Sequence, residues 1–265
     1  MKILITVDPE IPVPPKLYGG AERLVADLID AFTQLGHTVD LLAHKESNHP
    51  SVTKHYAYTS INSQGLLNVL RNSLAFKNAY GKSKPDFVLC FSRLLYVYLT
   101  AFLYRDAKFI KRYGRFISPK STGLAQKLLG KRLQLVAAAG HMLAHLPEKK
   151  RWEILFNFVD LEFYSDLKSP KEYYFFLGRI EDIKGVNEAI QAVKKARGKL
   201  LIAGNIEKEH QVYFETKVKP LLSEDIQYVG PVNNEQKRSY FRGAKATLFP
   251  IKWEEPFGIV MAESM

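Results

Sequence analysis

Two cations on one short loop are the first chemical feature of the sequence. Arg179 and Lys184 lie in FLGRIEDIKG, residues 176–185, where an apolar run gives way to a polar loop and then to a helix pattern. A helix N-terminus carries unpaired N–H groups and a partial positive charge, so cations beside it make an anion site. The spacing predicts a diphosphate site, although two such residues taken alone are more often ordinary loop charges.

The stretch WEEPFGIVMAESM, residues 253–265, holds a second feature, two glutamates with seven residues between them. Glu255 precedes an expected helix start, and Glu263 lies within that helix. We expect backbone N–H groups to face a ligand at three successive residues, Phe257, Gly258 and Ile259. Carboxylates accept hydrogen bonds from hydroxyls, so one glutamate suits a sugar and the other a ribose. Each glutamate alone reads as a surface acid, but both occur beside the predicted anion site.

Strand and helix patterns alternate around these residues. Apolar runs predict buried strands at residues 2–7, 37–44, 86–92, 133–140, 152–159, 173–178, 199–204, 226–230 and 246–251. Apolar residues recurring with the helical period predict helices over residues 21–35, 185–197, 207–222 and 234–243. Uninterrupted apolar strands suit parallel sheets that are covered on both faces.

The two arrays of strands and helices meet near residues 160–170. This order predicts an α/β protein of two doubly wound, Rossmann-like domains, with ligands at the carboxyl ends of the strands and between the domains. We expect a first domain over residues 1–160, a linker over 161–170 and a second domain over 171–265.

Composition restricts the class of protein. The chain has 265 residues, 46% of them hydrophobic, which is enough for a globular core. The single cysteine, Cys90, excludes an internal disulfide framework and fits a reducing compartment. The first ten residues lack the long apolar run of an export signal. Arg93 interrupts the apolar run 87–104, which therefore predicts a buried strand and helix rather than a membrane span. We expect a cytoplasmic protein.

The formal net charge of +11 is concentrated in one segment. Residues 108–151 carry 11 basic side chains and one acidic side chain, Glu148, with the stretch FIKRYGRFI at the centre. Such a patch could face an anionic membrane surface, a phosphorylated substrate or nucleic acid, or simply be a solvated face. No nucleic-acid-binding motif accompanies it, so we expect no nucleic-acid partner.

Taken together, these motifs resemble the family 4 glycosyltransferases, which are retaining enzymes of the GT-B fold. The Glu-seven-Glu element is the most specific part of the resemblance, and the agreement is diffuse between residues 45 and 150. The matching stretches are YGGAERLVADLI (18–29), FNFVD (156–160), FLGRIEDIKG (176–185), LLIAGN (200–205), YVGPV (228–232) and EPFGIVMAESM (255–265).

The resemblance implies a role for each candidate residue. Arg179 and Lys184 would neutralise the departing diphosphate, Glu255 would hold sugar hydroxyls, and Glu263 would hold the ribose. The donor would be a UDP- or GDP-sugar, bound without a metal or other cofactor, by a nucleotide-sugar-binding second domain. The acceptor would be a glycan, a lipid or a cell-envelope component, reached from the acceptor-side first domain at the inner face of the membrane. The further donor-binding residues implied are Gly19, Gly20, Gly230, Val232, Phe257, Gly258 and Ile259.

Two departures from the family pattern stand out. Many members carry a His-Gly pair after the fifth strand, where this sequence has Tyr113-Gly114. Members also continue beyond the Glu-seven-Glu helix, whereas this sequence stops at Met265. The resemblance therefore implies a truncated member with an incomplete second domain. That leaves two expectations, a working glycosyltransferase or a truncated, non-catalytic fragment or partner subunit.

Overall fold

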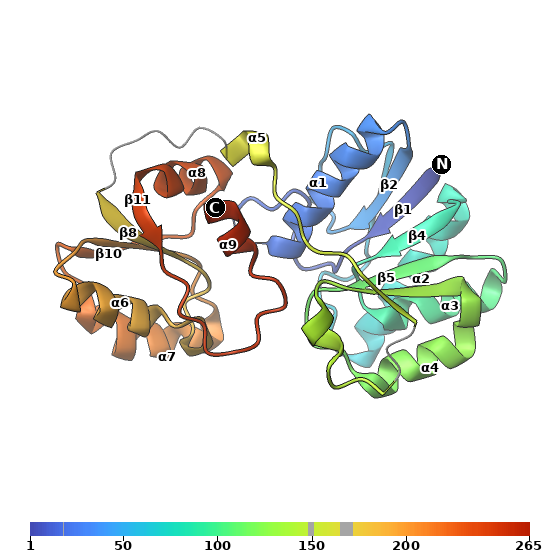
Figure 1. The fold of residues 1–265 in the computed structure, drawn as a ribbon. Helices are drawn as coiled ribbons and strands as arrows, with labels where there is room; N and C mark the ends of the chain where they lie inside the picture. Colours follow the sequence, from blue (N-terminus) through green and yellow to red (C-terminus); the bar gives the residue numbers. More distant parts are fainter. Residues whose placement is uncertain (18, 148–150, 165–171) are drawn as a thin grey trace. The chain divides into compact units, whose positions relative to one another are not determined.

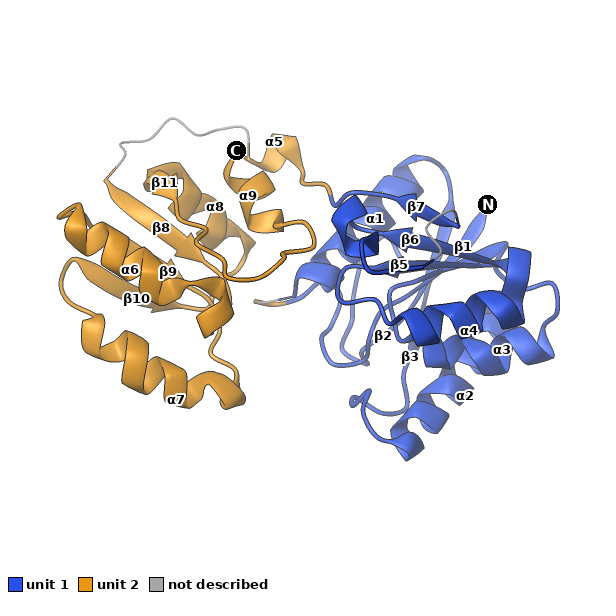
Figure 2. Ribbon diagram, turned by 60° about the horizontal axis from the view of Figure 1, so that its bottom comes forward, with its two compact units in different colours: residues 1–15, 19–157 blue, residues 16–18, 158–265 orange. Residues whose placement is uncertain are grey.

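The computed structural model describes residues 1–17, 19–147, 151–164 and 172–265 (Figure 1). The chain divides into two compact units (Figure 2). Unit 1 comprises Met1–Pro15 and Gly19–Asn157, and unit 2 comprises Lys16–Tyr18 and Phe158–Met265. Most of the linker expected at residues 161–170 lies outside the described residues.

Unit 1 is built on a seven-stranded sheet in the order β3-β2-β1-β4-β5-β6-β7, and every neighbouring pair is parallel. The winding reverses between β1 and β4, which makes the sheet doubly wound. The strands are β1 (Lys2–Thr6), β2 (Thr38–Ala43), β3 (Lys54–Ala57), β4 (Phe87–Cys90), β5 (Phe109–Tyr113), β6 (Leu133–Ala137) and β7 (Trp152–Ile154).

Helices cover both faces of this sheet. On one face, Val25 and Ile29 of α1 (Gly20–Gln34) pack with Ile3 and Ile5 of β1. Successive side chains of a strand point to opposite faces, so Leu4 packs on the other face. There it joins residues of three further helices, α2 (Leu66–Ser83), α3 (Val97–Leu103) and α4 (Pro119–Leu129). Short 3₁₀ turns are η1 (Leu94–Tyr96), η2 (Gly130–Arg132) and η3 (Gly140–Leu143).

Unit 2 has a four-stranded parallel sheet in the order β10-β9-β8-β11. Its strands are β8 (Tyr173–Leu177), β9 (Leu200–Ala203), β10 (Ile226–Gly230) and β11 (Ala244–Thr247). Its α-helices are α5 (Leu161–Tyr164), α6 (Val186–Lys195), α7 (Gln211–Tyr213), α8 (Asn234–Gly243) and α9 (Ile259–Ser264). The remaining turns are η4 (Asp182–Lys184), η5 (Lys208–His210), the π-helical η6 (Phe214–Val218) and η7 (Lys219–Leu221). Helix α6 packs on one face of the sheet and Phe241 of α8 packs on the other.

The predicted fold class is confirmed, because both units are doubly wound parallel sheets. Strand β3, strand β5 and helix α2 lie in the region of diffuse resemblance and were not predicted. The run 87–104 forms β4, η1 and α3 rather than one long helix. Across the described residues, no helix combines the length and apolar character needed to cross a membrane.

Two cations at the centre of the basic segment 108–151 are not on the surface, which corrects the sequence interpretation. Lys111 and Arg112 lie on β5 and are each 5% exposed. The Lys111 ammonium donates hydrogen bonds to the backbone carbonyls of Phe91 (3.1 Å) and Ser92 (2.7 Å), and burial lowers the pKa of Lys111. These two cations therefore cannot face a membrane. Residues 148–150 of the segment lie outside the described residues.

Candidate functional site

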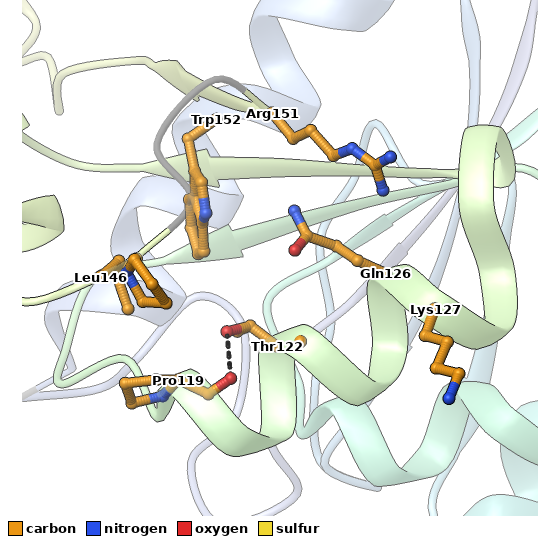
Figure 3. A pocket seen from close by; sticks show the side chains of 9 residues that line it. Pro119, Thr122, Gln126, Lys127, Leu146, Arg151 and Trp152 are labelled. Carbon is orange, nitrogen blue, oxygen red and sulfur yellow. Dashed lines mark hydrogen bonds between the residues drawn. The ribbon is translucent and has the colours of Figure 1, made fainter.

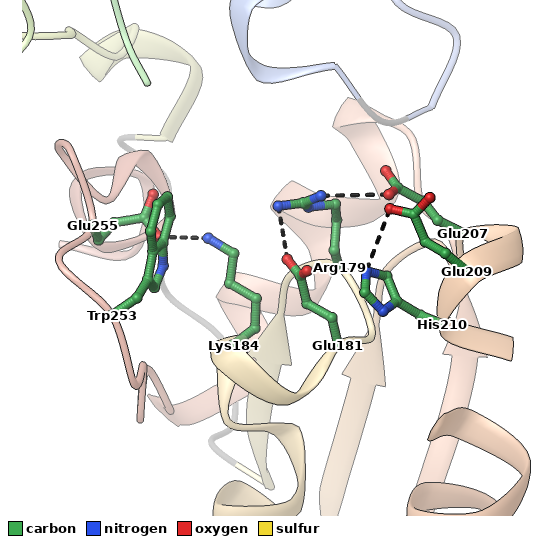
Figure 4. Close-up of polar contacts among 8 residues, drawn as sticks. All are labelled: Arg179, Glu181, Lys184, Glu207, Glu209, His210, Trp253 and Glu255. Atoms are coloured by element: carbon green, nitrogen blue, oxygen red, sulfur yellow. Dashed lines mark hydrogen bonds and ion pairs between the residues drawn. The ribbon is translucent and has the colours of Figure 1, made fainter. Parts of the chain in front are cut away.

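The candidate site of unit 2 lies on the loops after β8 and β11. The winding of the sheet reverses at β8, with β9 and β10 on one side and β11 on the other. In doubly wound sheets, ligands bind outside the carboxyl ends of the strands where the order reverses. The loop after β8 carries Arg179 and Lys184, and the loop after β11 carries Glu255 (Figure 4).

Gly178 and Gly204 fix the start of the loop after β8. The Gly178 amide donates to the Ala203 carbonyl (3.1 Å), and the Ile180 amide donates to the Asn205 carbonyl (3.0 Å). A Cβ on Gly204 would lie only 1.7 Å from the Gly178 carbonyl oxygen, so the close approach of the two strand ends requires glycine. Arg179 is therefore held on a rigid turn at the edge of the sheet.

Gly185 brings the two loops of the site together. It precedes α6 with a φ of 75°, and a Cβ there would lie 1.9 Å from the Pro250 carbonyl oxygen. Lys252 lies two residues after Pro250, and its backbone amide donates a hydrogen bond to the Ile183 carbonyl (2.9 Å). These contacts place Lys184, next to Gly185, beside the segment that carries Glu255.

Lys184, Trp253 and Glu255 form one cluster. The Lys184 Nζ lies 2.5 Å from Glu255 Oε2 and 4.7 Å from the centre of the Trp253 ring, while the Trp253 indole N–H donates to the same carboxylate oxygen at 2.9 Å. The side chains of Lys184 and Glu255 are 15% and 19% exposed, so the pair is partly shielded from water. Sequence reasoning named the lysine and the glutamate but missed the tryptophan, although it stands two residues before Glu255.

Arg179 lies among carboxylates that the sequence analysis did not single out. Its Nη2 is 2.7 Å from Glu181 Oε1, and its Nη1 is 3.4 Å from Glu207 Oε2. Glu181 is 4% exposed and also lies 3.1 Å from the His210 ring (Figure 4). These contacts orient the guanidinium, and a diphosphate bound here would share it with the two carboxylates.

One group of side chains could hold a metal ion. Among the residues that the structure describes, only Glu207, Glu209 and His210 bring three potential ligand atoms within 4.8 Å of one another. The Glu207 carboxylate already pairs with Arg179, and His210 already pairs with Glu181. The cluster thus reads as part of the ion-pair network that positions Arg179.

Glu263 forms an ion pair of its own, distinct from the pair between Lys184 and Glu255. It lies on α9 with 6% exposure, and its carboxylate pairs with the equally buried ammonium of Lys237 on α8. The Lys237 ammonium also lies 5.6 Å from the centre of the Tyr164 ring. A ribose bound to Glu263 would share that carboxylate with Lys237.

The other expected donor residues of unit 2 lie at the ends of β10 and before α9. Gly258 is the N-cap of α9 with a φ of 76°, which suits glycine, and Phe257 and Ile259 flank it. Gly230 ends β10, where its carbonyl accepts a hydrogen bond from the Gly204 amide (3.0 Å), and the partly buried Val232 packs against the core cluster that contains Phe175. These residues thus lie in two separate places, at the end of β10 and at the start of α9.

The glycine pair of unit 1 begins α1. Gly19 has a φ of 154°, and a Cβ there would lie 2.7 Å from Pro15 Cβ and 2.9 Å from Glu22 Oε2, whereas Gly20 has open space. Glu22 is 8% exposed, and burial raises its pKa to about 7. Asp8, after β1, accepts a hydrogen bond from the Arg93 amide (2.9 Å), and burial also raises its pKa. An acid in the first turn of an apolar helix was the signal that could have revealed Glu22.

Tyr113, which the resemblance aligns with the histidine of many family members, lies at the carboxyl end of β5. Its ring centre lies 4.7 Å from the Lys111 Nζ and 5.5 Å from the Trp152 ring centre. Burial raises the pKa of its phenol, so the hydroxyl stays neutral at physiological pH. The side chain can therefore donate a hydrogen bond but cannot supply a cation.

Unit 1 also contains a cavity of about 390 Å³ between α4 and β7 (Figure 3). Thr122 and Gln126 of α4 line one wall, and Arg151 and Trp152 line another. The side-chain nitrogen of Gln126 is buried and has no hydrogen-bond partner among the described residues. Sequence analysis gave no sign of this cavity, because its walls come from segments that are distant in the chain.

Comparison with known proteins provides the family evidence for unit 2. Residues 160–265 match the family model described as Glycosyl transferases group 1. That range contains the whole sheet of unit 2 and the candidate residues from Arg179 to Glu263. No curated protein sequence matches the chain.

Solved structures with a similar fold include glycosyltransferases and also UDP-N-acetylglucosamine 2-epimerases. AviGT4, a glycosyltransferase involved in avilamycin A biosynthesis, is 20% identical with a TM-score of 0.75, over 99% of this chain and 75% of that one. Sucrose-phosphate synthase from Thermosynechococcus elongatus is 17% identical with a TM-score of 0.74, over 99% and 78%. Staphylococcus aureus TarM, in complex with fondaparinux, α-GlcNAc-glycerol and UDP, is 11% identical with a TM-score of 0.72, over 99% and 83%. The chain therefore has the two-sheet fold of GT-B glycosyltransferase structures, and its residues 160–265 match the group 1 glycosyltransferase model.

Proposed function

We propose that the protein is a retaining, family 4-like glycosyltransferase that moves a hexosyl group from a nucleotide-diphosphate sugar to a glycan, lipid or cell-envelope acceptor. The observation that carries the proposal is the ion pair between Lys184 and Glu255, which joins the loop after β8, where Arg179 also lies, to the loop after β11. The match of residues 160–265 to the group 1 glycosyltransferase model supports the same assignment.

The proposed chemistry depends on charge at the leaving group. When the anomeric bond breaks, negative charge develops on the diphosphate oxygen, and fixed cations that face this oxygen lower the barrier. Arg179 and Lys184 are the residues for this task, aided by the N-terminus of α6 directly after Lys184. Carboxylates such as Glu255 accept hydrogen bonds from sugar hydroxyls and so fix the sugar.

The remaining donor contacts follow the sequence interpretation. Glu263 would accept hydrogen bonds from the ribose, and the backbone around Gly258 would lie against phosphate. Gly230 and Val232 would lie near the base, and the glycine pair at Gly19 would serve the donor phosphate or the acceptor. We further propose that the donor is a UDP- or GDP-sugar, that no metal takes part, and that the protein works in the cytoplasm.

Isothermal titration calorimetry of the 265-residue chain with UDP, GDP and ADP tests the donor site. We expect one nucleotide to bind, and we expect Arg179→Ala and Lys184→Ala to weaken that binding at least tenfold, since hydrogen bonds to charged groups contribute roughly 1.5 to 3 kcal/mol each. Lys194→Ala is the matched control, because Lys194 is an exposed cation at the far end of α6. Equal effects of Lys194→Ala and Lys184→Ala, or no binding by any nucleotide, would refute the assignment.

Two further measurements separate the finer parts of the proposal. Addition of EDTA is expected to leave the dissociation constant unchanged, whereas a loss of binding would show that a metal is required. Product analysis by NMR with the matching nucleotide sugar is expected to show the same anomeric configuration as the donor. Nucleotide binding that depends on Arg179, without turnover of any donor or acceptor, would instead support the alternative that this chain is a non-catalytic fragment or partner subunit.

A further inference from the structure

The outer surface of α2, α3 and α4 is distinct from the rest of unit 1. All three helices pack on the same face of the seven-stranded sheet, opposite α1 (Figure 2). Their inward residues, such as Phe76, Ala101 and Ala125, are fully or almost fully buried in one cluster. The outward side chains of these helices therefore form the solvent boundary of that face.

Large apolar side chains are exposed along α2. Leu66 is 87% exposed, Leu67 is 59%, Leu70 is 54% and Leu74 is 46%. Leu66, Leu70 and Leu74 follow one another at intervals of four residues, so they lie along one side of the helix. Single exposed leucines need no explanation, whereas contiguous apolar patches are typical of interaction surfaces.

The neighbouring helices continue this pattern. Phe102 at the end of α3 is 66% exposed, and α2 packs directly against α3. On α4, Leu124 is 52% exposed and Leu128 is 58% exposed, again four residues apart. The apolar surface thus extends over all three helices rather than belonging to one of them.

The same surface lacks negative charge. None of the three helices contains an aspartate or glutamate, whereas α2 carries Arg71, Lys77 and Lys82 and α4 carries Lys120 and Lys127. Lys120, Lys127 and Lys131 are exposed in and directly after α4. We call the outward side chains of these helices the leucine–lysine face, defined by Leu66, Leu70, Phe102, Leu124 and Leu128 together with these three lysines.

The helix on the opposite face of the sheet shows the contrast. Helix α1 carries three acids, Glu22, Asp27 and Asp30, and a single cation, Arg23. Its apolar residues Leu24, Val25 and Ile29 are buried against the sheet. The leucine–lysine face is therefore not a general property of the unit 1 helices.

We propose that the leucine–lysine face binds an anionic lipid bilayer. Exposed leucines can enter the boundary between lipid headgroups and acyl chains, and cations around them attract anionic lipids. A second copy of this chain would place the same positive face against itself, which like-charge repulsion opposes. Nucleic acid would use the lysines but would leave the exposed leucines without a partner. This inference goes beyond the proposed transfer reaction, because it assigns a partner to residues remote from the donor loops.

Vesicle flotation of the full chain tests the proposal without any donor or acceptor. The probes are vesicles of phosphatidylcholine alone and of phosphatidylcholine with a quarter phosphatidylglycerol, at low and at high salt. We expect binding to the anionic vesicles only, weakened by salt because surface charge is screened.

Matched variants locate the binding surface. The triple variant Lys120→Glu, Lys127→Glu and Lys131→Glu is expected to reduce the partition coefficient about a hundredfold, because each cation near an anionic surface contributes roughly fivefold. The control is Lys194→Glu, Lys195→Glu and Lys199→Glu, which makes the same change of charge at exposed positions of unit 2. Replacement of Leu70, Phe102 and Leu124 by serine is expected to reduce binding at least tenfold, whereas Leu35→Ser with Val212→Ser should leave it unchanged.

Three flotation results would overturn the proposal. They are no binding of the wild-type chain to anionic vesicles, equal loss of binding in the unit 2 control, and full binding by the serine variant. Light scattering tests the alternative that the face binds a second copy of the chain. Dimers that the wild-type chain forms and the serine variant does not would support that alternative and overturn the proposal. Nucleotide binding by each variant, measured in parallel, verifies that the donor site is folded.

Discussion

The buried ion pair between Lys237 and Glu263 leads to a prediction about the stability of unit 2. The two side chains are 8% and 5% exposed, and they join α8 to α9. Removal of one member leaves an uncompensated charge in a low-dielectric interior, which typically costs 3 to 5 kcal/mol. Lys237→Met and Glu263→Met should each lower the free energy of unfolding by roughly that amount.

The double variant shows whether Lys237 and Glu263 contribute to stability as a coupled pair or independently of each other. Replacement of both residues by methionine removes both charges, and hydrophobic replacements of buried pairs are often neutral or stabilising. We therefore expect the double variant to lie within about 2 kcal/mol of wild type, which gives a coupling energy of at least about 4 kcal/mol.

Urea denaturation followed by circular dichroism gives these free energies, and hydrogen exchange of the α8 amides assigns the change to unit 2. Because the chain divides into two compact units, the curve is fitted with one transition for each unit. Single variants that each cost less than 1 kcal/mol, or costs that add in the double variant, would refute the description of a buried, coupled pair.

Three other predictions follow from contacts in the structure. Because burial raises the pKa of Glu22 from 4.5 to about 7, the native state binds more protons than the unfolded state between these values; stability should therefore fall by about 3 kcal/mol as pH rises through this window. Glu22→Gln should abolish this fall in urea titrations at pH 4.5 to 8, and a pH profile identical to wild type would contradict it. Gly185→Ala should lower the free energy of unfolding of unit 2 by at least 2 kcal/mol, since its Cβ would meet the Pro250 carbonyl in a left-handed backbone region, and thermal melts measure this against the open-space control Gly20→Ala. Gln126→Met should raise the free energy of unfolding of unit 1 by about 1 kcal/mol, because it removes a buried unpaired donor; a loss of stability in urea would show that the amide is satisfied in solution.

The sequence predicted the fold because its strands are uninterrupted apolar runs bounded by turn residues. Strand β5 was missed because Lys111 and Arg112 lie at its centre and resemble a charged surface. Their stabilising partners are backbone carbonyls, among them those of Phe91 and Leu155, which only the folded sheet brings near. The pattern of apolar residues cannot reveal such a strand, because the contacts that stabilise its charged side chains form only in the folded protein.

For the candidate site, the sequence identified residue types but not their partners. Lys184 and Glu255 are 71 positions apart, and only the parallel arrangement of β8 and β11 makes them neighbours. The carboxylates around Arg179 escaped notice because acids on a polar loop are common. Glu263 was recognised from its spacing alone, while its buried partner Lys237 follows from the packing of α9 against α8.

The position of Trp253 gives the protein an intrinsic optical reporter. The chain has two tryptophans, and the other, Trp152, is 8% exposed in unit 1, while Trp253 is 36% exposed beside an ammonium and a carboxylate. Indole emission depends on nearby charge and on contact with water. A ligand that draws Lys184 or Glu255 away from the ring should therefore change the fluorescence of unit 2 over the constant signal of Trp152. Occupancy of the loops could then be followed in real time, with no label attached to the protein.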